Sequence, residues 1–391
     1  MTRPSSRGIS QGLAFPMKIA VVGPTYPYRG GIAHYTTLMV RHLRQRHSVQ
    51  FYSFTSQYPR WLFPGRTDRD PSQAALKEPC EYLLSPLNPP SWLRTAGRIH
   101  ADNPDALITP WWVTCWAPAW SVLTRLARVG RTIQTIFICH NVLPHERVWW
   151  DRPLARLALS AGDGFIVHSQ QDADVLLAMF PHAGVRVTPH PTYRPVGKKA
   201  LAPTAARQAL GLDAARPVLL FFGFVRPYKG LDLLLDALPL VRREIPAHLL
   251  VVGEIWGEEA SYRQQVERLG LADHVTFVNR YVPNEELGVY FGAADVVVLP
   301  YRSATQSGVV QLAFGFGKPV ITTRIGGLAE VVADGVSGLI VPPGEPSVLA
   351  DAILCFYQDE LGPVLAAGVA AQMGRFSWER LVNVIDELAS V

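Results

Sequence analysis

Twelve short apolar segments, separated by stretches long enough for a helix, restrict the possible folds of this 391-residue chain more than any other feature. Continuous apolar strands that alternate with helices form parallel sheets with helices on both faces. The segments form two series, with the first at 18–23, 49–54, 105–110, 135–140, 164–169 and 185–190 and the second at 218–223, 248–254, 274–279, 295–300, 319–323 and 338–343. The sequence therefore predicts an α/β protein with two doubly wound, Rossmann-like domains. Because ligands bind beyond the carboxyl ends of such strands, the cleft between the domains is the expected site.

The two series are separated by a proline-rich stretch without apolar periodicity, which predicts a linker. The first sixteen residues lack the apolar core of a signal peptide. Near the end of the chain, Ser377 is a suitable cap for a last helix that packs on one domain or bridges both. The expected divisions are a disordered tail at 1–16, an N-terminal domain at 17–192, a linker at 193–206, a C-terminal domain at 207–375 and a terminal helix at 376–391.

Positive charge and tryptophan are concentrated in the N-terminal half. Residues 1–200 contain 23 Lys and Arg against 11 Asp and Glu, whereas residues 201–391 contain 14 against 21, and eight of the ten tryptophans lie in the first half. This asymmetry indicates an anionic partner with an apolar boundary, for which a membrane surface and nucleic acid are the candidates. The apolar segment 60–66, flanked by arginines, favours the membrane, unless its apolar residues simply cover the core.

The four cysteines are widely spaced, which argues against a zinc site or a disulfide framework and indicates a reducing compartment. No stretch approaches the ~20 apolar residues needed to span a bilayer. The expected location is therefore the cytoplasm, with peripheral attachment to the inner face of the cytoplasmic membrane. Acidic pairs with metal-ligand spacing are absent from the strand ends, so no metal cofactor is expected.

Two strand ends in the first domain contain candidate site residues. Gly30 and Gly31 precede a helix, where free N–H groups bind anions, although a glycine pair also suits a flexible loop. His140 and Asn141 end a fully apolar strand and are expected to project into the cleft. The alternative for His140 is a hydrogen-bonding role that closes the strand.

In the second domain, the stretch FFGFVRPYKG at 221–230 ends a strand on two cations. Nucleotide phosphates would pair with Arg226 as a fork and with Lys229 as a point charge, and the alternative is a solvated turn. Further along, 299–343 contains two more helix starts, one at the Ser-Gly of 307–308 and one at the Gly-Gly of 326–327. The candidate donor-contacting residues of this second stretch are Thr305, Gln306, Ser307, Gly308, Val309 and Glu330.

In this order, the motifs resemble the retaining GT-B glycosyltransferases of family four (glycosyl transferases group 1). The resemblance covers residues 17–391 and is most specific in the second domain, through FGFVRPYKGLDLLLDAL, LLVVGE and GKPVITTRIGGLAEVVADGVSGLIVPP. It implies a sugar transfer with retention of configuration from a nucleotide-sugar donor, for which a UDP- or GDP-linked sugar is expected. The charge asymmetry and the apolar segment favour a glycan or lipid-linked acceptor, in the synthesis of cell-envelope polysaccharide or glycolipid. The resemblance also implies that the final helix crosses back onto the N-terminal domain.

The resemblance also assigns roles to single residues. His140 is expected in the donor-sugar pocket, and Arg226 and Lys229 are expected to bind the diphosphate; these are the candidate catalytic residues. The expected donor contacts are Gly30 and Gly31 at the diphosphate, Gly253, Tyr281 and Val282 along the nucleoside, and Ser307, Gly308 and Val309 at the sugar and phosphate.

The sequence departs from the family pattern at two places. Phe224 stands where many members have the first phosphate-binding arginine, so Arg226 is expected to serve instead. Ala304 and Leu312 stand at the positions of the paired glutamates, and Gln306 or Gln311 is expected to replace them. The missing glutamates keep open a non-catalytic nucleotide-sugar-binding or membrane-docked partner protein. A sugar-nucleotide epimerase can share this fold, but it needs no acceptor surface and would leave the basic half unexplained. A third alternative is an RNA-binding protein, whose affinity would fall steeply with salt.

Overall fold

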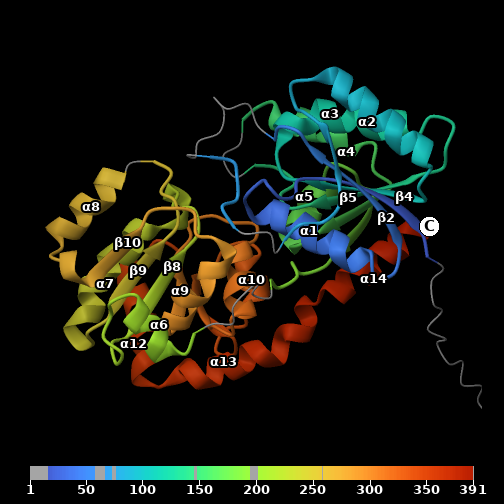
Figure 1. The fold of residues 1–391 in the computed structure, drawn as a ribbon. Coiled ribbons are helices and arrows are strands. Elements are labelled where there is room, and N and C mark those ends of the chain that lie inside the picture. The colour runs from blue at the N-terminus through green and yellow to red at the C-terminus, as the bar shows by residue number, and fades with distance from the viewer. Residues whose placement is uncertain are drawn as a thin grey trace, which may run out of the picture.

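The computed structural model describes residues 16–57, 67–72, 76–144, 148–193, 201–257 and 259–390. It contains two lobes, each built on one parallel sheet with helices on both faces (Figure 1). All twelve predicted segments form strands, which confirms the predicted fold class. The apolar segment 60–66 lies outside the described residues, as do most of the N-terminal tail and part of the linker.

The N-terminal lobe has a seven-stranded sheet in the order β3-β2-β1-β4-β5-β6-β7. Its strands are β1 (Lys18–Val22), β2 (Ser48–Phe54), β3 (Glu81–Leu84), β4 (Ala106–Trp111), β5 (Gln134–Cys139), β6 (Gly164–Val167) and β7 (Gly184–Val187). The sequence analysis missed β3, because this four-residue edge strand is only partly buried and lacks the continuous apolar character of the others.

Helices cover both faces of this sheet. The helices are α1 (Gly31–Leu43), α2 (Pro89–Asp102), α3 (Ala117–Ala127), α4 (Asp151–Leu159), α5 (Gln170–Leu177) and α14 (Trp378–Ala389). The buried side chains of α2 to α5 form one core with the strands, and those of α1 and α14 form a second core on the other face. The helical period matches this division, since α3 buries Trp120, Leu123 and Ala127 at intervals of three and four.

The C-terminal lobe has a six-stranded sheet in the order β10-β9-β8-β11-β12-β13. Its strands are β8 (Val218–Phe222), β9 (His248–Val252), β10 (Val275–Val278), β11 (Val296–Leu299), β12 (Val320–Thr323) and β13 (Gly338–Val341). Its helices are α6 (Pro203–Ala209), α7 (Leu231–Glu244), α8 (Glu259–Arg268), α9 (Leu287–Ala293), α10 (Gly308–Gly315), α11 (Leu328–Val331), α12 (Pro346–Gln358) and α13 (Leu361–Gln372).

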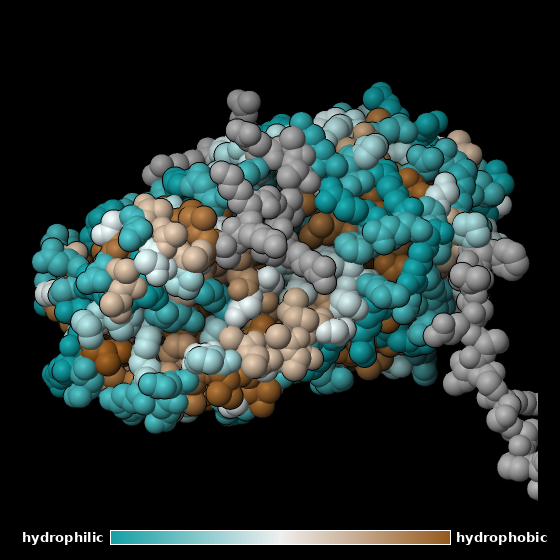
Figure 2. All heavy atoms as spheres, turned by 60° about the horizontal axis from the view of Figure 1, so that its bottom comes forward, coloured by the Kyte–Doolittle hydropathy of each residue, from teal (hydrophilic) through white to brown (hydrophobic). Residues whose placement is uncertain are grey.

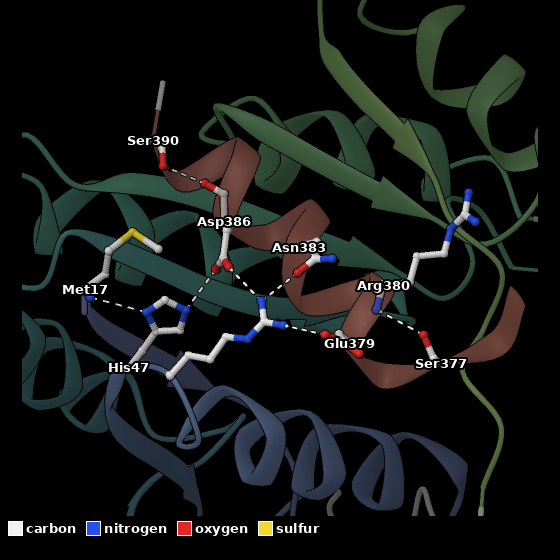
Figure 3. A network of polar contacts seen from close by, with 9 residues as sticks. Met17, His47, Ser377, Glu379, Arg380, Asn383, Asp386 and Ser390 are labelled. Carbon is white, nitrogen blue, oxygen red and sulfur yellow. Dashed lines mark hydrogen bonds and ion pairs between the residues drawn. The ribbon is translucent and has the colours of Figure 1, made fainter. Parts of the chain in front are cut away.

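The last helix, α14, follows the C-terminal lobe in sequence but packs against α1 and β5 of the N-terminal lobe (Figure 1). The Ser377 side chain caps the helix by accepting a hydrogen bond from the N–H of Arg380. Figure 3 shows the polar network at the contact, where Asp386 Oδ1 lies 2.9 Å from His47 Nε2. Arg46 Nη1 adds a hydrogen bond of 2.6 Å to Asn383. No helix of the described residues is long and apolar enough to cross a membrane.

Candidate active site

Both sheets have a topological switch point, where the chain order reverses. In the N-terminal lobe β1 pairs with both β2 and β4, and in the C-terminal lobe β8 pairs with both β9 and β11. The carboxyl end of a parallel sheet is open for ligands at such a point, because the connections on its two sides diverge. Gly30 and Gly31 follow β1, Lys229 follows β8, and Ser307 follows β11, so the switch points bring these residues to one region.

A cavity of about 290 Å³ lies between the lobes at the switch points. Ten of the residues predicted for the site line it: Gly30, Gly31, Lys229, Gly253, Tyr281, Val282, Gln306, Ser307, Gly308 and Val309. The sequence analysis did not assign the other lining residues, which are His34, Leu38, Leu76, Tyr193, Phe222, Gly223, Phe224, Tyr228, Glu254, Asn284, Leu287, Tyr301 and Leu312.

Lys229 is the cation of this cavity. The residue is only 7% exposed, and its ammonium lies 5.4 Å from the centroid of the Tyr301 ring. Burial lowers the pKa of Lys229 to about 8, and the neighbouring Arg226 contributes to the shift. Gly230 makes this position possible, since its φ is +69° and a Cβ there would lie 2.1 Å from the carbonyl oxygen of Pro300.

Two helix N-termini lie at the same cavity, since Gly30, Gly31, Ser307 and Gly308 line it. Helix α1 starts after Gly30, whose φ is 111°, and α10 starts after Ser307, and neither cap residue makes a side-chain capping bond. The Ser307 side chain, which interacts with the Tyr301 hydroxyl, is the side-chain donor at the start of α10, whereas Gln306 Nε2 is already bonded to the carbonyl oxygen of His140. The N–H groups at the helix starts and the positive ends of two helix dipoles make this cavity suitable for an anion.

A buried ion pair joins the lobes beside the cavity. Arg29 Nη1 lies 2.6 Å from Glu254 Oε2, and both side chains are almost completely buried. The Arg29 guanidinium also lies 5.4 Å from the Phe224 ring centroid and 5.2 Å from that of Tyr281. Arg29 comes from the N-terminal lobe and its three partners from the C-terminal lobe, so the pair stabilises the closed arrangement.

Three predicted site residues contribute to contacts between the lobes and do not line the cavity. Thr305 Oγ1 donates a hydrogen bond of 2.6 Å to Asn141 Oδ1. The Glu330 carboxylate accepts from the N–H of Gln170, at 2.9 Å and 3.1 Å, at the N-terminus of α5. A carboxylate in this position is stabilised by the α5 dipole.

The His140 ring also lies away from the cavity, although its carbonyl oxygen accepts a hydrogen bond of 2.7 Å from Gln306 Nε2. The ring is buried among His168, His190 and Tyr35, with its centroid 4.6 Å from that of Tyr35. Burial, together with the two other histidines, lowers the pKa of His140 well below its usual value. In this structure the side chain packs instead beside His168, which directly follows β6, and His190, which lies three residues after β7.

Arg226, the other predicted phosphate ligand, is half-buried just outside the cavity lining. Its guanidinium lies 5.6 Å from the centroid of the Tyr228 ring and 5.9 Å from that of Trp256. In this conformation Lys229, and not Arg226, presents its charge to the cavity.

The cavity is apolar where the family pattern has an acidic residue. Leu312 lines it, and Ala304 is buried with its carbonyl oxygen against Gly326. Of the two glutamines expected to replace the glutamates, Gln306 lines the cavity, whereas Gln311 is buried in the core and does not. Among the described residues, no group of three or more His, Cys, Asp or Glu is arranged to hold a metal ion.

Comparisons with known proteins agree with this architecture. Residues 216–359 match the family model for glycosyl transferases group 1, and residues 29–192 match that for Glycosyltransferase Family 4. In several curated relatives the matched region spans only 40% to 55% of the relative's own length.

Among the relatives, a D-inositol 3-phosphate glycosyltransferase of Segniliparus rotundus is 41% identical over 181 residues, which is 45% of this chain and 40% of the relative. A D-inositol 3-phosphate glycosyltransferase 1 of Catenulispora acidiphila is 30% identical over 312 residues, which is 74% of this chain and 73% of the relative. The solved structure of HepE from Anabaena, in complex with UDP and glucose, superposes with a TM-score of 0.71 at 21% identity over 96% of this chain and 100% of that protein. This similarity shows the GT-B fold, and the chain belongs to glycosyltransferase family 4.

Proposed function

We propose that this protein transfers a sugar from a UDP- or GDP-linked donor to a glycan or lipid-linked acceptor, with retention of configuration. The observation that carries the proposal is the convergence of Lys229 and the N-termini of α1 and α10 on one cavity between the lobes. The size of the cavity and its position at two switch points suit a nucleotide. The Anabaena structure, which contains UDP and glucose, supports the choice of donor class.

The chemistry follows from charge. The bond between the anomeric carbon and the phosphate oxygen breaks, and negative charge develops on the departing diphosphate. Lys229 and the N–H groups at the helix starts stabilise that charge in the cavity between the lobes. The acceptor hydroxyl forms the new bond to the anomeric carbon, and its proton passes to the leaving phosphate. Protein cations and helix dipoles neutralise the charge of the leaving diphosphate, a role that a metal ion has in other enzymes. We therefore propose a metal-independent reaction that is insensitive to EDTA.

The acceptor is proposed to bind the basic N-terminal lobe, at or near an anionic membrane surface. The excess of Lys and Arg over Asp and Glu in residues 1–200 supports this assignment. The curated relatives are named D-inositol 3-phosphate glycosyltransferases, so an acceptor with an anionic group is the first class to test.

A panel of UDP- and GDP-sugars tests the proposal, first by thermal shift and then by release of nucleoside diphosphate in the presence of membrane extract. One donor is expected to raise the melting temperature and to release its diphosphate. Binding of a nucleotide sugar without release of diphosphate would favour a non-catalytic partner protein. This alternative rests on Ala304 and Leu312, which stand at the positions of the family's paired glutamates. No binding by any nucleotide sugar would contradict the proposal.

A further inference from the structure

Three helices of the N-terminal lobe present apolar side chains to solvent. Helices α2, α3 and α4 pack side by side (Figure 1). Single exposed apolar residues are common, whereas several on adjoining helices mark a candidate interaction site. The exposed side chains on these helices and their ends are Leu93 (55%), Leu126 (41%), Val129 (62%), Trp149 (82%), Trp150 (45%) and Leu157 (45%), and we name this set the α2–α4 surface.

The two tryptophans are held in the exposed position by the structure beneath them. Asp151, only 3% exposed, accepts a hydrogen bond of 2.8 Å from the N–H of Val148 and one of 2.5 Å from Thr114 Oγ1. The rings of Trp149 and Trp150 pack edge-on, with centroids 5.2 Å apart. These hydrogen bonds anchor the backbone at Val148 and Asp151, on either side of the two tryptophans, and the Trp149 ring, at 82% exposure, is not part of the core.

On α3 and α4 the exposed charge is positive, whereas Arg98 of α2 pairs with the partly exposed Glu81. The only acidic residue of α3 and α4 is the buried Asp151, whereas Arg125, Arg152 and Arg156 are exposed. Within the described chain, Arg152 and Arg156 form no hydrogen bond or ion pair, so their charges remain available to a partner. Arg125 Nη2 donates to the carbonyl oxygen of Leu157 at 3.1 Å, which joins the exposed faces of α3 and α4.

We propose that the α2–α4 surface docks the protein on an anionic lipid bilayer. Tryptophan side chains are favoured at the headgroup level, leucine and valine enter the acyl boundary, and arginines attract acidic lipids. The aliphatic residues distinguish this surface from one for single-stranded nucleic acid, which relies on stacking and charge. This inference rests on the membrane association proposed above, and it names the surface that makes the contact.

The position of the surface suits an acceptor delivered from a membrane. Asn141, which bonds Thr305 across the cleft, precedes Val148 by seven residues, and a chain of that length spans at most about 25 Å. The side of the N-terminal lobe brought forward in Figure 2 is mostly hydrophilic, with scattered apolar residues. Docking through α2–α4 therefore places the cleft within a short distance of the bilayer.

The test is co-sedimentation of the full chain with phosphatidylcholine vesicles, with and without phosphatidylglycerol. The wild-type protein is expected to sediment with the anionic vesicles only, and less at high salt. The pair Trp149→Ser and Trp150→Ser, and separately the pair Arg152→Glu and Arg156→Glu, are expected to weaken binding about tenfold or more. Val364→Ser is the matched control, because Val364 is 64% exposed on α13 in the other lobe, and it is expected to change nothing.

Each outcome has a distinct meaning. If wild-type protein does not sediment with anionic vesicles, both the membrane association and the proposed docking surface are wrong. If it binds poly(U) instead, the surface is assigned to nucleic acid. Variants that bind vesicles as well as wild type overturn the α2–α4 assignment but leave membrane association in place. UDP binding, measured for every variant, reports separately on the fold and on the proposed donor site.

Discussion

Arg29 of the N-terminal lobe and Glu254 of the C-terminal lobe form a buried ion pair, with 2.6 Å between Nη1 and Oε2. The two residues are 225 positions apart in sequence and meet only because the lobes close on each other. Any opening of the cleft wide enough to admit a large ligand separates them.

Removing one partner of this pair is expected to destabilise the protein more than removing both. Arg29→Met leaves the Glu254 carboxylate buried without this counter-charge and is expected to lower the free energy of unfolding by about 3 to 5 kcal/mol. Glu254→Gln leaves the Arg29 guanidinium without this counter-charge and is expected to destabilise the protein by a similar amount. The double variant is expected to recover part of that loss, as chemical unfolding of all four proteins can measure. The control is Glu81→Gln, which breaks the exposed Glu81–Arg98 pair and is expected to cost less than about 1 kcal/mol. If the loss of stability in the double variant equals the sum of the losses in the two single variants, the pair does not couple the lobes.

Gly230→Ala is expected to destabilise the C-terminal lobe strongly. The left-handed φ alone costs an alanine about 1 kcal/mol, and the Cβ would also meet the Pro300 carbonyl oxygen at 2.1 Å. Gly270→Ala is the matched control, since Gly270 has a φ of +66° with no atom within 4 Å of the added Cβ. Measured by thermal unfolding, the stability of Gly230→Ala is expected to be at least about 2 kcal/mol lower than that of Gly270→Ala. Equal losses for the two variants would mean that the close approach to Pro300 is absent in solution.

The affinity for UDP or GDP is expected to fall as the pH rises above 8. Burial holds the pKa of Lys229 at about 8, so the free protein loses this positive charge at higher pH. The bound diphosphate favours the charged form, so binding above pH 8 takes up a proton and weakens by up to about tenfold per pH unit. Calorimetry in buffers of different ionisation enthalpy measures this uptake, and Lys229→Met is expected to show none. An affinity that stays constant from pH 7 to 9.5 in the wild type would contradict the assignment.

The protein is expected to lose stability as the pH falls from 6.5 toward 5, because of the buried histidine cluster. Burial lowers the pKa of His168 to about 4 and that of His190 to about 3, from 6.5 in the unfolded chain. Between pH 6.5 and 5 the unfolded state binds more protons than the native state. Each of the two histidines is therefore expected to lower the free energy of unfolding by about 1 to 2 kcal/mol at pH 5. Urea unfolding at several pH values measures the slope.

Two variants separate this effect from general acid sensitivity. His190→Gln, which cannot take up the proton, is expected to flatten the dependence between pH 6.5 and 5, whatever its stability at neutral pH. His182→Asn, at an exposed position, is expected to leave the slope unchanged. Identical slopes in wild type and His190→Gln would show that the cluster is protonated in the native state.

The strands and the glycine-rich strand ends could be predicted because their signals are local. The strands at 218–222 and 296–299 are continuous apolar runs, and the positions of Lys229 and Ser307 after them follow from the topology of parallel sheets. The short strand at 81–84 gave no such signal because it lies at an edge of the sheet and is only partly buried.

Other features arise only from long-range packing. The ring of His140 turns toward His168 and His190 because two later strands end beside it, and no local pattern indicates this. The exposure of Trp149 is equally hidden, since an apolar pair at a helix start is typical of a core. The sequence alone therefore predicted many of the residues that line the cavity, but neither the ion pair that joins the lobes beside it nor the surface on α2–α4.

Calorimetric titration of UDP and GDP into wild type, Lys229→Met and Arg243→Ala is the most direct test of the anion-binding cavity. The wild-type protein is expected to bind one nucleotide, and Lys229→Met to bind it roughly ten to a hundred times more weakly, because one charge-assisted contact is lost. Arg243, an exposed cation near the end of α7, serves as the matched control and is expected to leave the affinity unchanged. Wild-type affinity in Lys229→Met would contradict the proposal that this lysine and the two helix N-termini hold the diphosphate.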